Sequence, residues 1–366
     1  MLTRVQRLKI DLFVDGMTIS PLAKVELSHI SRNRPLTLAD YATTSGIPLI
    51  LPDDIWVNVP INDYNPNFVV TPRYILDWDE TVFTIRSNEF KCIVTPLPVP
   101  DYNFKLNSAG EPHSWYGIIH TDRVRIAPIA GCSNSCKFCD LPRKFKYKKK
   151  SIPLLIESIH AAISEQILPA RHVLISGGTP KDSDFQYLND VYFKILEAFP
   201  SVPIDIMMLP INEVLDLSAL QLAGLHGLSI NLELYNDSAR KELMPEKNTI
   251  HKNKWLSFIE KAVEVFGSNV RSALIVGLEP IEDTIQGVRA LAERGCSPVL
   301  SPFRPDPTTP LSDLTPPSAN LLADVYQKAI EVLASYDVKL GPKCIPCQHN
   351  TLTFPDGSDY YHRFLL

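Results

Sequence analysis

Three cysteines close together in the sequence are the residues best suited to chemistry. Cys132, Cys136 and Cys139 have a CxxxCxxC spacing, with Phe138 directly before the third cysteine. Thiolates are the usual ligands of iron–sulfur clusters, and three on one loop can hold three irons of a [4Fe–4S] cube, which leaves the fourth iron open. The alternatives are a zinc knuckle and unligated buried cysteines. Zinc sites usually pair two CxxC-like units, however, and no second pair lies nearby in the sequence.

The spacing and the aromatic residue resemble the signature of the radical S-adenosylmethionine (SAM) enzymes. In that family, the open iron chelates the amino and carboxylate groups of the methionine part of SAM. An electron from the cluster breaks a carbon–sulfur bond, and the resulting 5′-deoxyadenosyl radical removes a hydrogen from the substrate. The resemblance therefore implies a [4Fe–4S] cluster and SAM as cofactors, and a position against SAM for Phe138.

Strands that alternate with amphipathic helices begin at about residue 123, which predicts a parallel sheet with crossover helices. The family fold is a partial (β/α)6 barrel of the TIM type, in which the loops after the strands carry the chemistry. The cysteine loop follows the first predicted strand, as this rule requires. The predicted strands are residues 124–128, 172–176, 203–208, 227–233, 270–276 and 298–302, and the predicted helices are 152–167, 185–198, 213–223, 253–266, 282–293 and 316–335.

A turn after the second predicted strand resembles the family's GGE motif, whose backbone carbonyls receive the amino group of SAM. The turn contains Gly177, Gly178 and Thr179. Glycine suits this position because it lets the backbone approach a ligand closely. Thr179 stands where the family usually has an acid, so only the backbone role carries over.

The fourth predicted strand ends in a segment similar to the one with which lipoyl and biotin synthases hold the ribose of SAM. Asn231 and Glu233 are two residues apart, so on a strand both side chains point to the same face. A carboxylate accepts hydrogen bonds from both ribose hydroxyls. A capped strand end is the alternative interpretation. Arg240 and Lys247 follow in a family-like stretch, and one of them is expected to meet the SAM carboxylate.

Two later strand ends give weaker matches. Ile275 and Gly277 fit the GxIxGxxE element that flanks adenine, but Ala273 replaces its first glycine and Pro280 replaces its acid. Only the role in apolar packing therefore carries over. Arg304 follows the sixth predicted strand in a segment like that of biotin-synthase-like members. It is expected to pair with a substrate carboxylate or with SAM, and an exposed loop arginine is the alternative.

A second pair of cysteines near the C-terminus has the spacing of metal ligands. Cys344 and Cys347 are three residues apart, and His349 follows. A predicted short strand at 338–340 would put the pair on the open, active-site side of the barrel, where Cys92 completes the ligand set if the N-terminal region caps the barrel mouth. This arrangement predicts an auxiliary iron–sulfur cluster. Structural zinc, as in aminomutase relatives with C-terminal cysteines, and unligated thiols are the alternatives.

The chain divides into three regions. Residues 1–110 are rich in short predicted strands, residues 111–336 form the predicted barrel, and residues 337–366 form a tail that carries the second cysteine pair. A lone cysteine, Cys296, precedes the sixth predicted strand and is expected in the core at the closed end of the barrel. Within the N-terminal region, the predicted strands are 8–14, 55–59, 82–86 and 90–94, and the predicted linker is 101–111.

Composition excludes several kinds of partner. With 366 residues, a net charge of −5 and a pI near 6.0, the chain has no electrostatic footprint for nucleic acid. A basic run at 143–150 could attract an anionic substrate or an acidic electron donor, or form a solvated loop. No membrane span or cleavage signal is predicted, so a cytoplasmic location is expected. Seven cysteines in ligand-like groups fit a reducing compartment.

The leading functional hypothesis is a radical SAM enzyme that acts on a small-molecule substrate and receives electrons from a donor such as flavodoxin or ferredoxin. The alternatives are an iron–sulfur electron-transfer or cluster-carrier protein without SAM chemistry, and a radical SAM enzyme with only structural zinc at its C-terminus. A carrier needs neither the Gly177 turn nor the Glu233 carboxylate, and this chain has both.

Overall fold

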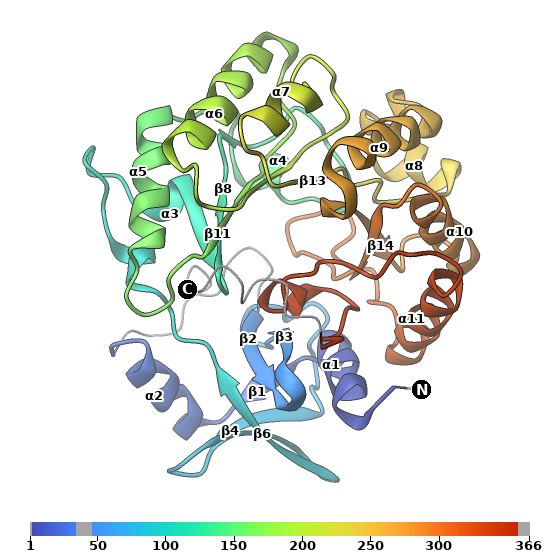
Figure 1. Ribbon diagram of the computed structural model, residues 1–366. Helices are drawn as coiled ribbons and strands as arrows, with labels where there is room; N and C mark the ends of the chain where they lie inside the picture. The colour runs from blue at the N-terminus through green and yellow to red at the C-terminus, as the bar shows by residue number, and fades with distance from the viewer. Residues whose placement is uncertain (1, 34–45, 358–366) are drawn as a thin grey trace.

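A curved sheet built from residues 117–302 carries the cysteine loop (Figure 1). The computed structural model describes residues 2–33 and 46–357. Within this seven-stranded sheet the order is β15-β14-β13-β12-β11-β8-β7, and all neighbouring pairs are parallel except β7 with β8. The strands are β7 (Gly117–His120), β8 (Arg123–Ile126), β11 (His172–Ile175), β12 (Ile204–Met207), β13 (Gly227–Ser229), β14 (Val270–Val276) and β15 (Ser297–Pro302).

Helices connect the parallel strands and lie on the outer side of the curved sheet (Figure 1). The strand interiors are apolar because both faces of the sheet are covered, as in β11, where all four residues are buried. None of the described helices is long and apolar enough to span a bilayer. The helices that accompany the curved sheet are α4 (Leu141–Lys144), α5 (Ile152–Ile163), α6 (Phe185–Ala198), α7 (Leu217–Leu222), α8 (Asp237–Leu243), α9 (Lys252–Phe266), α10 (Ile281–Ala292) and α11 (Ala319–Leu333). Short elements complete it: η4 (Asp182–Asp184), η5 (Lys247–Thr249), η6 (Gly267–Asn269) and η7 (Pro346–Asn350), and a β9 (Ile129–Ala130) and β10 (Lys148–Lys149) pair.

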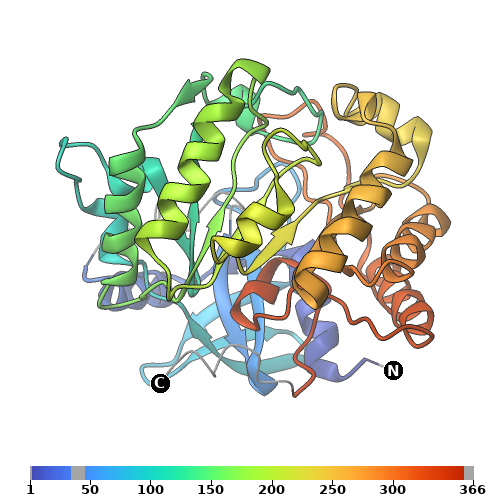
Figure 2. The same ribbon diagram turned by 45° about the horizontal axis from the view of Figure 1, so that its top comes forward.

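The N-terminal part forms a second sheet of six strands in the order β1-β4-β5-β6-β2-β3. Both views place it at one side of the curved sheet, with α1 beside α11 (Figures 1 and 2). Buried residues of both parts belong to one continuous hydrophobic core. The strands are β1 (Met17–Ile19), β2 (Gly46–Leu51), β3 (Ile55–Pro60), β4 (Tyr74–Trp78), β5 (Phe83–Ser87) and β6 (Phe90–Pro96), and the helices are α1 (Arg4–Asp15), α2 (Pro21–Ile30), η2 (Pro52–Asp54), η3 (Asp101–Phe104) and α3 (His113–Tyr116).

The predicted strand at 8–14 is wrong, because this segment lies inside helix α1. Thr3 begins the helix with a capping box in which its side chain accepts from the backbone of Gln6. The prediction rested on the alternation of polar and apolar residues, which treats Lys9 as exposed. In the structure Lys9 is buried, so the alternation does not mark an exposed and a buried face. Its Nζ donates to the backbone carbonyls of Gln348 (2.9 Å) and Thr353 (2.7 Å), and burial lowers its pKa well below the usual value.

The six predicted strands and six predicted helices of the barrel are confirmed, with shifts of a few residues at their ends. Three differences matter for the site. Helix α8 and strand β7 were not predicted, and the short strand expected at 338–340 is not formed. The expected linker at 101–111 is ordered, because η3 buries Tyr102, whose backbone N–H donates to Glu165. The division of the chain into three regions stays a prediction.

Candidate active site

The three cysteines of the loop line a cavity of about 170 Å³ at the C-terminal edge of the curved sheet. Parallel strands end at the same edge, so residues that follow different strands converge there. Phe138, Gly177, Gly178, Thr179, Asn231 and Glu233, which the sequence motifs predicted, lie on the same walls. Further lining residues are Arg125, Asn134, Leu141, Ser176, Met207, Met208, Leu209 and Lys247.

Hydrogen bonds hold the cysteine loop in shape. The Cys132 sulfur accepts from the backbone N–H of Thr179 (3.1 Å) and of Asn134 (3.4 Å). The guanidinium of Arg143 donates to the carbonyls of Cys136 (3.0 Å) and Cys139. Donors aimed at a sulfur and at the loop carbonyls suit a thiolate ligand, because they stabilise negative charge on sulfur and fix the direction of the loop.

Gly178 lies directly against the cysteine loop. A Cβ atom on Gly178 would be 1.9 Å from the carbonyl oxygen of Gly131 and 2.6 Å from the Cα of Cys132. Gly131 itself has a positive φ of 68°, a conformation that favours glycine. The backbone of this turn therefore packs closely against the cysteine loop. A side chain at Gly178 would displace either the turn or the loop.

Burial disfavours the charged form of two of the cysteines. It raises the pKa of Cys136 to about 12 and that of Cys139 to about 11. Both thiols are therefore protonated near neutral pH when no metal is bound, and cluster assembly must displace these protons. Three thiols on one loop, backbone donors to sulfur and a cavity beside them together fit a [4Fe–4S] cluster with one open iron.

Asn231 and Glu233 reach the same cavity for a different reason from the one predicted. Strand β13 ends at Ser229, so these residues are not on a strand. Glu233 has a positive φ of 66°, an uncommon conformation for this residue, and its side chain binds Lys247 at 2.7 and 2.8 Å. Burial opposes the charge of Lys247, but Glu233 and Cys136 outweigh it, so the pKa of Lys247 is raised. The cavity therefore holds a charged carboxylate–ammonium pair.

Arg240 and Arg304 do not line the cavity. Arg240 is fully buried, and its guanidinium donates to the carbonyls of Leu232 and Leu234. It thus supports the segment that carries Glu233, and Lys247 is the cation of this stretch that faces the cavity. Arg304 donates to the carbonyl of Asn58 and to the side chain of Asn350. Both guanidinium groups thus bond the chain itself, and direct contact of either arginine with SAM or a substrate stays a prediction.

The segment with Ile275 and Gly277, which is expected to flank adenine, packs against the cysteine loop. Ile275 belongs to a small apolar cluster around Cys136 that also includes Phe138. Gly277 has a φ of 105° and lies against Pro317. The acid sought at position 280 is present one residue earlier, as Glu279, which accepts from the backbone N–H groups of Tyr235 and Asn236. A one-residue tolerance in the motif would have found it.

Helix α8 supports the loop from the outside. Asn236 caps the helix by accepting from the backbone of Ala239, a signal that the sequence does carry. Leu243 and Met244 of its C-terminal end pack in the apolar cluster around Cys136, and the Leu243 carbonyl accepts from the backbone of Lys137.

The basic run at 143–150 is largely paired within the chain. Besides Arg143, Lys144 binds Asp140 and Asp306, Lys149 binds Asp184, and the buried ammonium of Lys150 donates to a backbone carbonyl. The run therefore fixes the segment around the cysteine loop, and attraction of an anionic partner stays a prediction.

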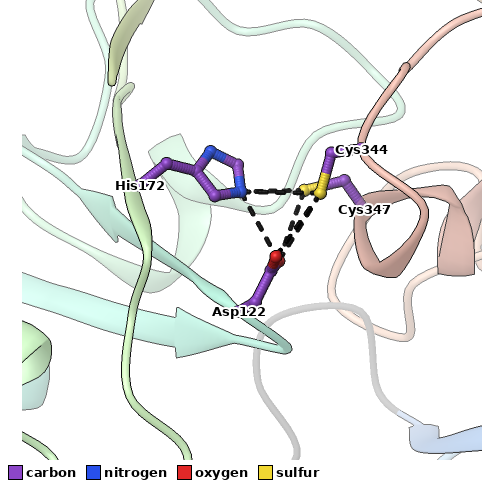
Figure 3. A group of neighbouring side chains, drawn as sticks. All are labelled: Asp122, His172, Cys344 and Cys347. Atoms are coloured by element: carbon purple, nitrogen blue, oxygen red, sulfur yellow. Dashed lines mark hydrogen bonds and ion pairs between the residues drawn. The ribbon is translucent and has the colours of Figure 1, made fainter. Parts of the chain in front are cut away.

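Cys344 and Cys347 lie at the opposite end of the sheet from the cysteine loop, so their expected position on the open side is wrong. Their neighbours are Asp122, just before β8, and His172, the first residue of β11 (Figure 3). Neither of the further ligands proposed from the sequence joins this group. Cys92 lies in β6 of the N-terminal sheet, and the Nδ1 of His349 bonds the carbonyl of Pro346. Cys296 is buried just before β15, as expected.

Comparison with known proteins identifies the family of this architecture. The sequence profile described as the radical SAM superfamily matches residues 126–292, from the end of β8 to the end of α10. A curated protein of Chlorobaculum limnaeum, bacteriochlorophyllide c C-7(1)-hydroxylase, is 23% identical over 143 residues. The match spans 38% of this chain and 36% of that protein, so well under half of the relative's length is aligned.

One solved structure agrees at the level of the fold. A radical SAM methyltransferase from Sphaerobacter thermophilus superposes with a TM-score of 0.50 and 14% identity, over 75% of this chain and 78% of that one. SuiB of Streptococcus suis bound to S-adenosylmethionine gives a TM-score of 0.47 and 14% identity, over 63% and 53%. The matched region contains the three loop cysteines and the cavity walls that follow β11 and β13. Residues 126–292, a little under half of the chain, therefore form a domain of the radical SAM superfamily of enzymes.

Proposed function

We propose that this enzyme cleaves SAM reductively at a [4Fe–4S] cluster and uses the product to remove a hydrogen atom from a small-molecule substrate. The observation that carries the proposal is convergence. Three loop thiols, a Gly-Gly turn and a carboxylate from three separate chain segments face one cavity at the edge where parallel strands end. An electron carrier needs only the thiols.

Different residues around the cavity would bind the cluster and SAM. Cys132, Cys136 and Cys139 would hold the cluster. When bound, the cluster supplies the electron that cleaves SAM and so gives the 5′-deoxyadenosyl radical. The backbone carbonyls of the Gly177 turn would accept hydrogen bonds from the amino group of SAM, and Glu233 would accept them from its ribose hydroxyls.

Lys247 takes the role of cation for the carboxylate of SAM. Its ammonium already bonds both oxygens of Glu233, so the two side chains share a fixed geometry. A carboxylate that is already held in one rotamer loses little conformational entropy when it binds hydroxyl groups. Asn231 completes this wall, with its Oδ1 accepting from Ser229 and from the backbone of Ala273.

The name of the curated relative supports hydrogen abstraction as the reaction. That protein is a hydroxylase of bacteriochlorophyllide c, and hydroxylation at carbon replaces a carbon–hydrogen bond. For the present chain we carry over a small-molecule substrate and an electron donor such as flavodoxin or ferredoxin. An auxiliary iron–sulfur cluster is not part of the proposal, because Cys344 and Cys347 lie in the tail beside the starts of β8 and β11, away from the cavity.

Anaerobic reconstitution tests the proposal. The wild-type protein is expected to bind about four irons in a cubane cluster and to convert SAM to 5′-deoxyadenosine when a strong reductant is supplied. Iron analysis, electron paramagnetic resonance of the reduced cluster and chromatography of the products check these expectations. A reduced cluster whose spectrum does not change when SAM is added, with no 5′-deoxyadenosine formed, would favour an electron carrier instead.

The variant Glu233→Ala is expected to weaken SAM binding without removing iron. The change removes charge-assisted hydrogen bonds of about 1.5–3 kcal/mol, which corresponds to roughly tenfold to hundredfold weaker binding. Calorimetry on the reconstituted protein measures the effect. Glu242→Ala is the matched control, because Glu242 is an exposed acid on α8 that pairs only at 3.6 Å with Lys137. Equal SAM affinity in both variants would place the ribose elsewhere.

A further inference from the structure

Four metal-binding side chains meet at the end of the curved sheet opposite the cavity. Asp122, His172, Cys344 and Cys347 each offer one ligand atom, and these atoms all lie within 4.8 Å of one another (Figure 3). All four residues are buried. They come from three chain segments: the turn between β7 and β8, the start of β11, and the C-terminal tail. No family motif in the sequence covers this set.

Five of the six distances between these atoms lie close to the edges of a tetrahedron around one ion, and the sixth, between the two sulfurs, is at most 4.8 Å. The His172 Nε2 is 3.4 Å from an oxygen of Asp122, 3.6 Å from the Cys344 sulfur and 3.5 Å from the Cys347 sulfur. The Asp122 oxygen is 3.6 and 4.0 Å from the two sulfurs. Zinc bonds of 2.0–2.3 Å to nitrogen, oxygen and sulfur in regular tetrahedral geometry give edges of about 3.3–3.8 Å.

Charge also favours an ion at this position. Two thiols, a carboxyl group and an imidazole are expensive to bury together, because any ionised member needs a partner of opposite charge. A divalent ion supplies that partner, takes the thiol protons away as it binds, and satisfies all four ligands at once. The combination of two sulfurs, one nitrogen and one oxygen suits zinc, whereas calcium and magnesium prefer oxygen ligands alone.

We propose that Asp122, His172, Cys344 and Cys347 bind one zinc ion, which fastens the C-terminal tail to the barrel. With four protein ligands the ion has no open position, so its role is structural. The tail that it fastens also contacts the N-terminal part of the chain. Arg304 bonds Asn350 and the Asn58 carbonyl, and Lys9 bonds the Gln348 carbonyl. The zinc therefore stabilises the contact between the N-terminal sheet and the barrel.

Metal analysis tests the site, and the variant Cys132→Ala/Cys136→Ala/Cys139→Ala separates it from the SAM cluster. Purified with that cluster absent, this triple variant is expected to retain about one zinc ion per chain, the number that one four-ligand site holds. Cobalt exchanged for zinc should give the intense visible bands of a tetrahedral thiolate site. Iron in place of zinc, with the absorption of a cluster, would overturn the proposal and restore an auxiliary cluster.

Two further variants locate the ligands. Cys344→Ser/Cys347→Ser, made in the wild-type background, is expected to lose the zinc, to melt at a lower temperature and to become sensitive to protease in the tail, while SAM cleavage persists. Asp122→Asn keeps the shape of the side chain and is expected to weaken zinc retention against a chelator, so the test does not depend on folding of the double variant. Cys296→Ala removes a buried thiol outside the group and should keep the zinc. Wild-type protein without zinc, with Cys344 and Cys347 reactive toward thiol reagents, would refute the site.

Discussion

Replacement of Cys132, Cys136 and Cys139 with alanine is expected to remove the SAM cluster completely and to abolish formation of 5′-deoxyadenosine. The three sulfurs are the cluster ligands that the loop offers, and the neighbouring donors from Thr179 and Arg143 cannot replace a thiolate. Iron content, the spectrum of the reduced cluster and product analysis each measure the loss. The reduction should reach the background of the assay, because SAM cleavage depends on the electron that the cluster supplies.

The matched control for this variant is Cys296→Ala. Cys296 is buried, as Cys136 is, but it lies just before β15, at the opposite end of the sheet. This change should leave cluster iron and SAM cleavage at the wild-type level. Continued formation of 5′-deoxyadenosine by the triple variant would overturn the assignment of the cluster to this loop.

The second large effect is expected for Gly178→Ala. Its methyl group would overlap the carbonyl of Gly131 and crowd Cys132, so either the turn or the cysteine loop must move. Overpacking of this kind costs about 1–3 kcal/mol. If this cost falls on the cluster-binding conformation of the loop, the cluster is retained roughly fivefold to hundredfold less well. Iron retention during gel filtration in the presence of a chelator measures this loss.

Gly177→Ala is the control for the neighbouring position. A Cβ atom on Gly177 would be 3.4 Å from the nearest atom, the carbonyl oxygen of Ile129, which is an ordinary contact. Iron retention should therefore stay near that of the wild type. If Gly178→Ala also kept its iron, the tight contact between turn and loop would not be required for cluster assembly.

Much of the barrel could be predicted because its signals are local. Buried parallel strands are short apolar runs and their helices are amphipathic, so both patterns lie within a dozen residues of sequence. Helix α1 was mistaken for a strand because the partners of its buried Lys9 lie more than three hundred residues away. A prediction from periodicity treats every lysine as exposed. No local pattern in the sequence indicates that Lys9 is buried.

The residues of the two sites were likewise predicted where their signals are local and missed where they are not. The cysteine spacing, the Gly178 turn and Glu233 are compact motifs, and the rule that chemistry follows the strands brought them to one edge. Asp122 and His172 were missed for two reasons: they stand at the beginnings of strands, where that rule expects no chemistry, and their partners belong to a tail whose course no local pattern defines. The tail was assigned to the wrong end because a strand predicted at 338–340 is not formed.

The contacts of Lys9 have a consequence for how the protein is made on the ribosome. Its two carbonyl acceptors, Gln348 and Thr353, follow it by 339 and 344 residues. Helix α1 is therefore synthesised well before these acceptors, and it cannot complete these bonds until the tail that carries them has been made. At about 5–20 residues per second this wait is on the order of tens of seconds. Over that interval the Lys9 ammonium lacks its carbonyl acceptors, so the burial of Lys9 is a late step in the folding of the chain.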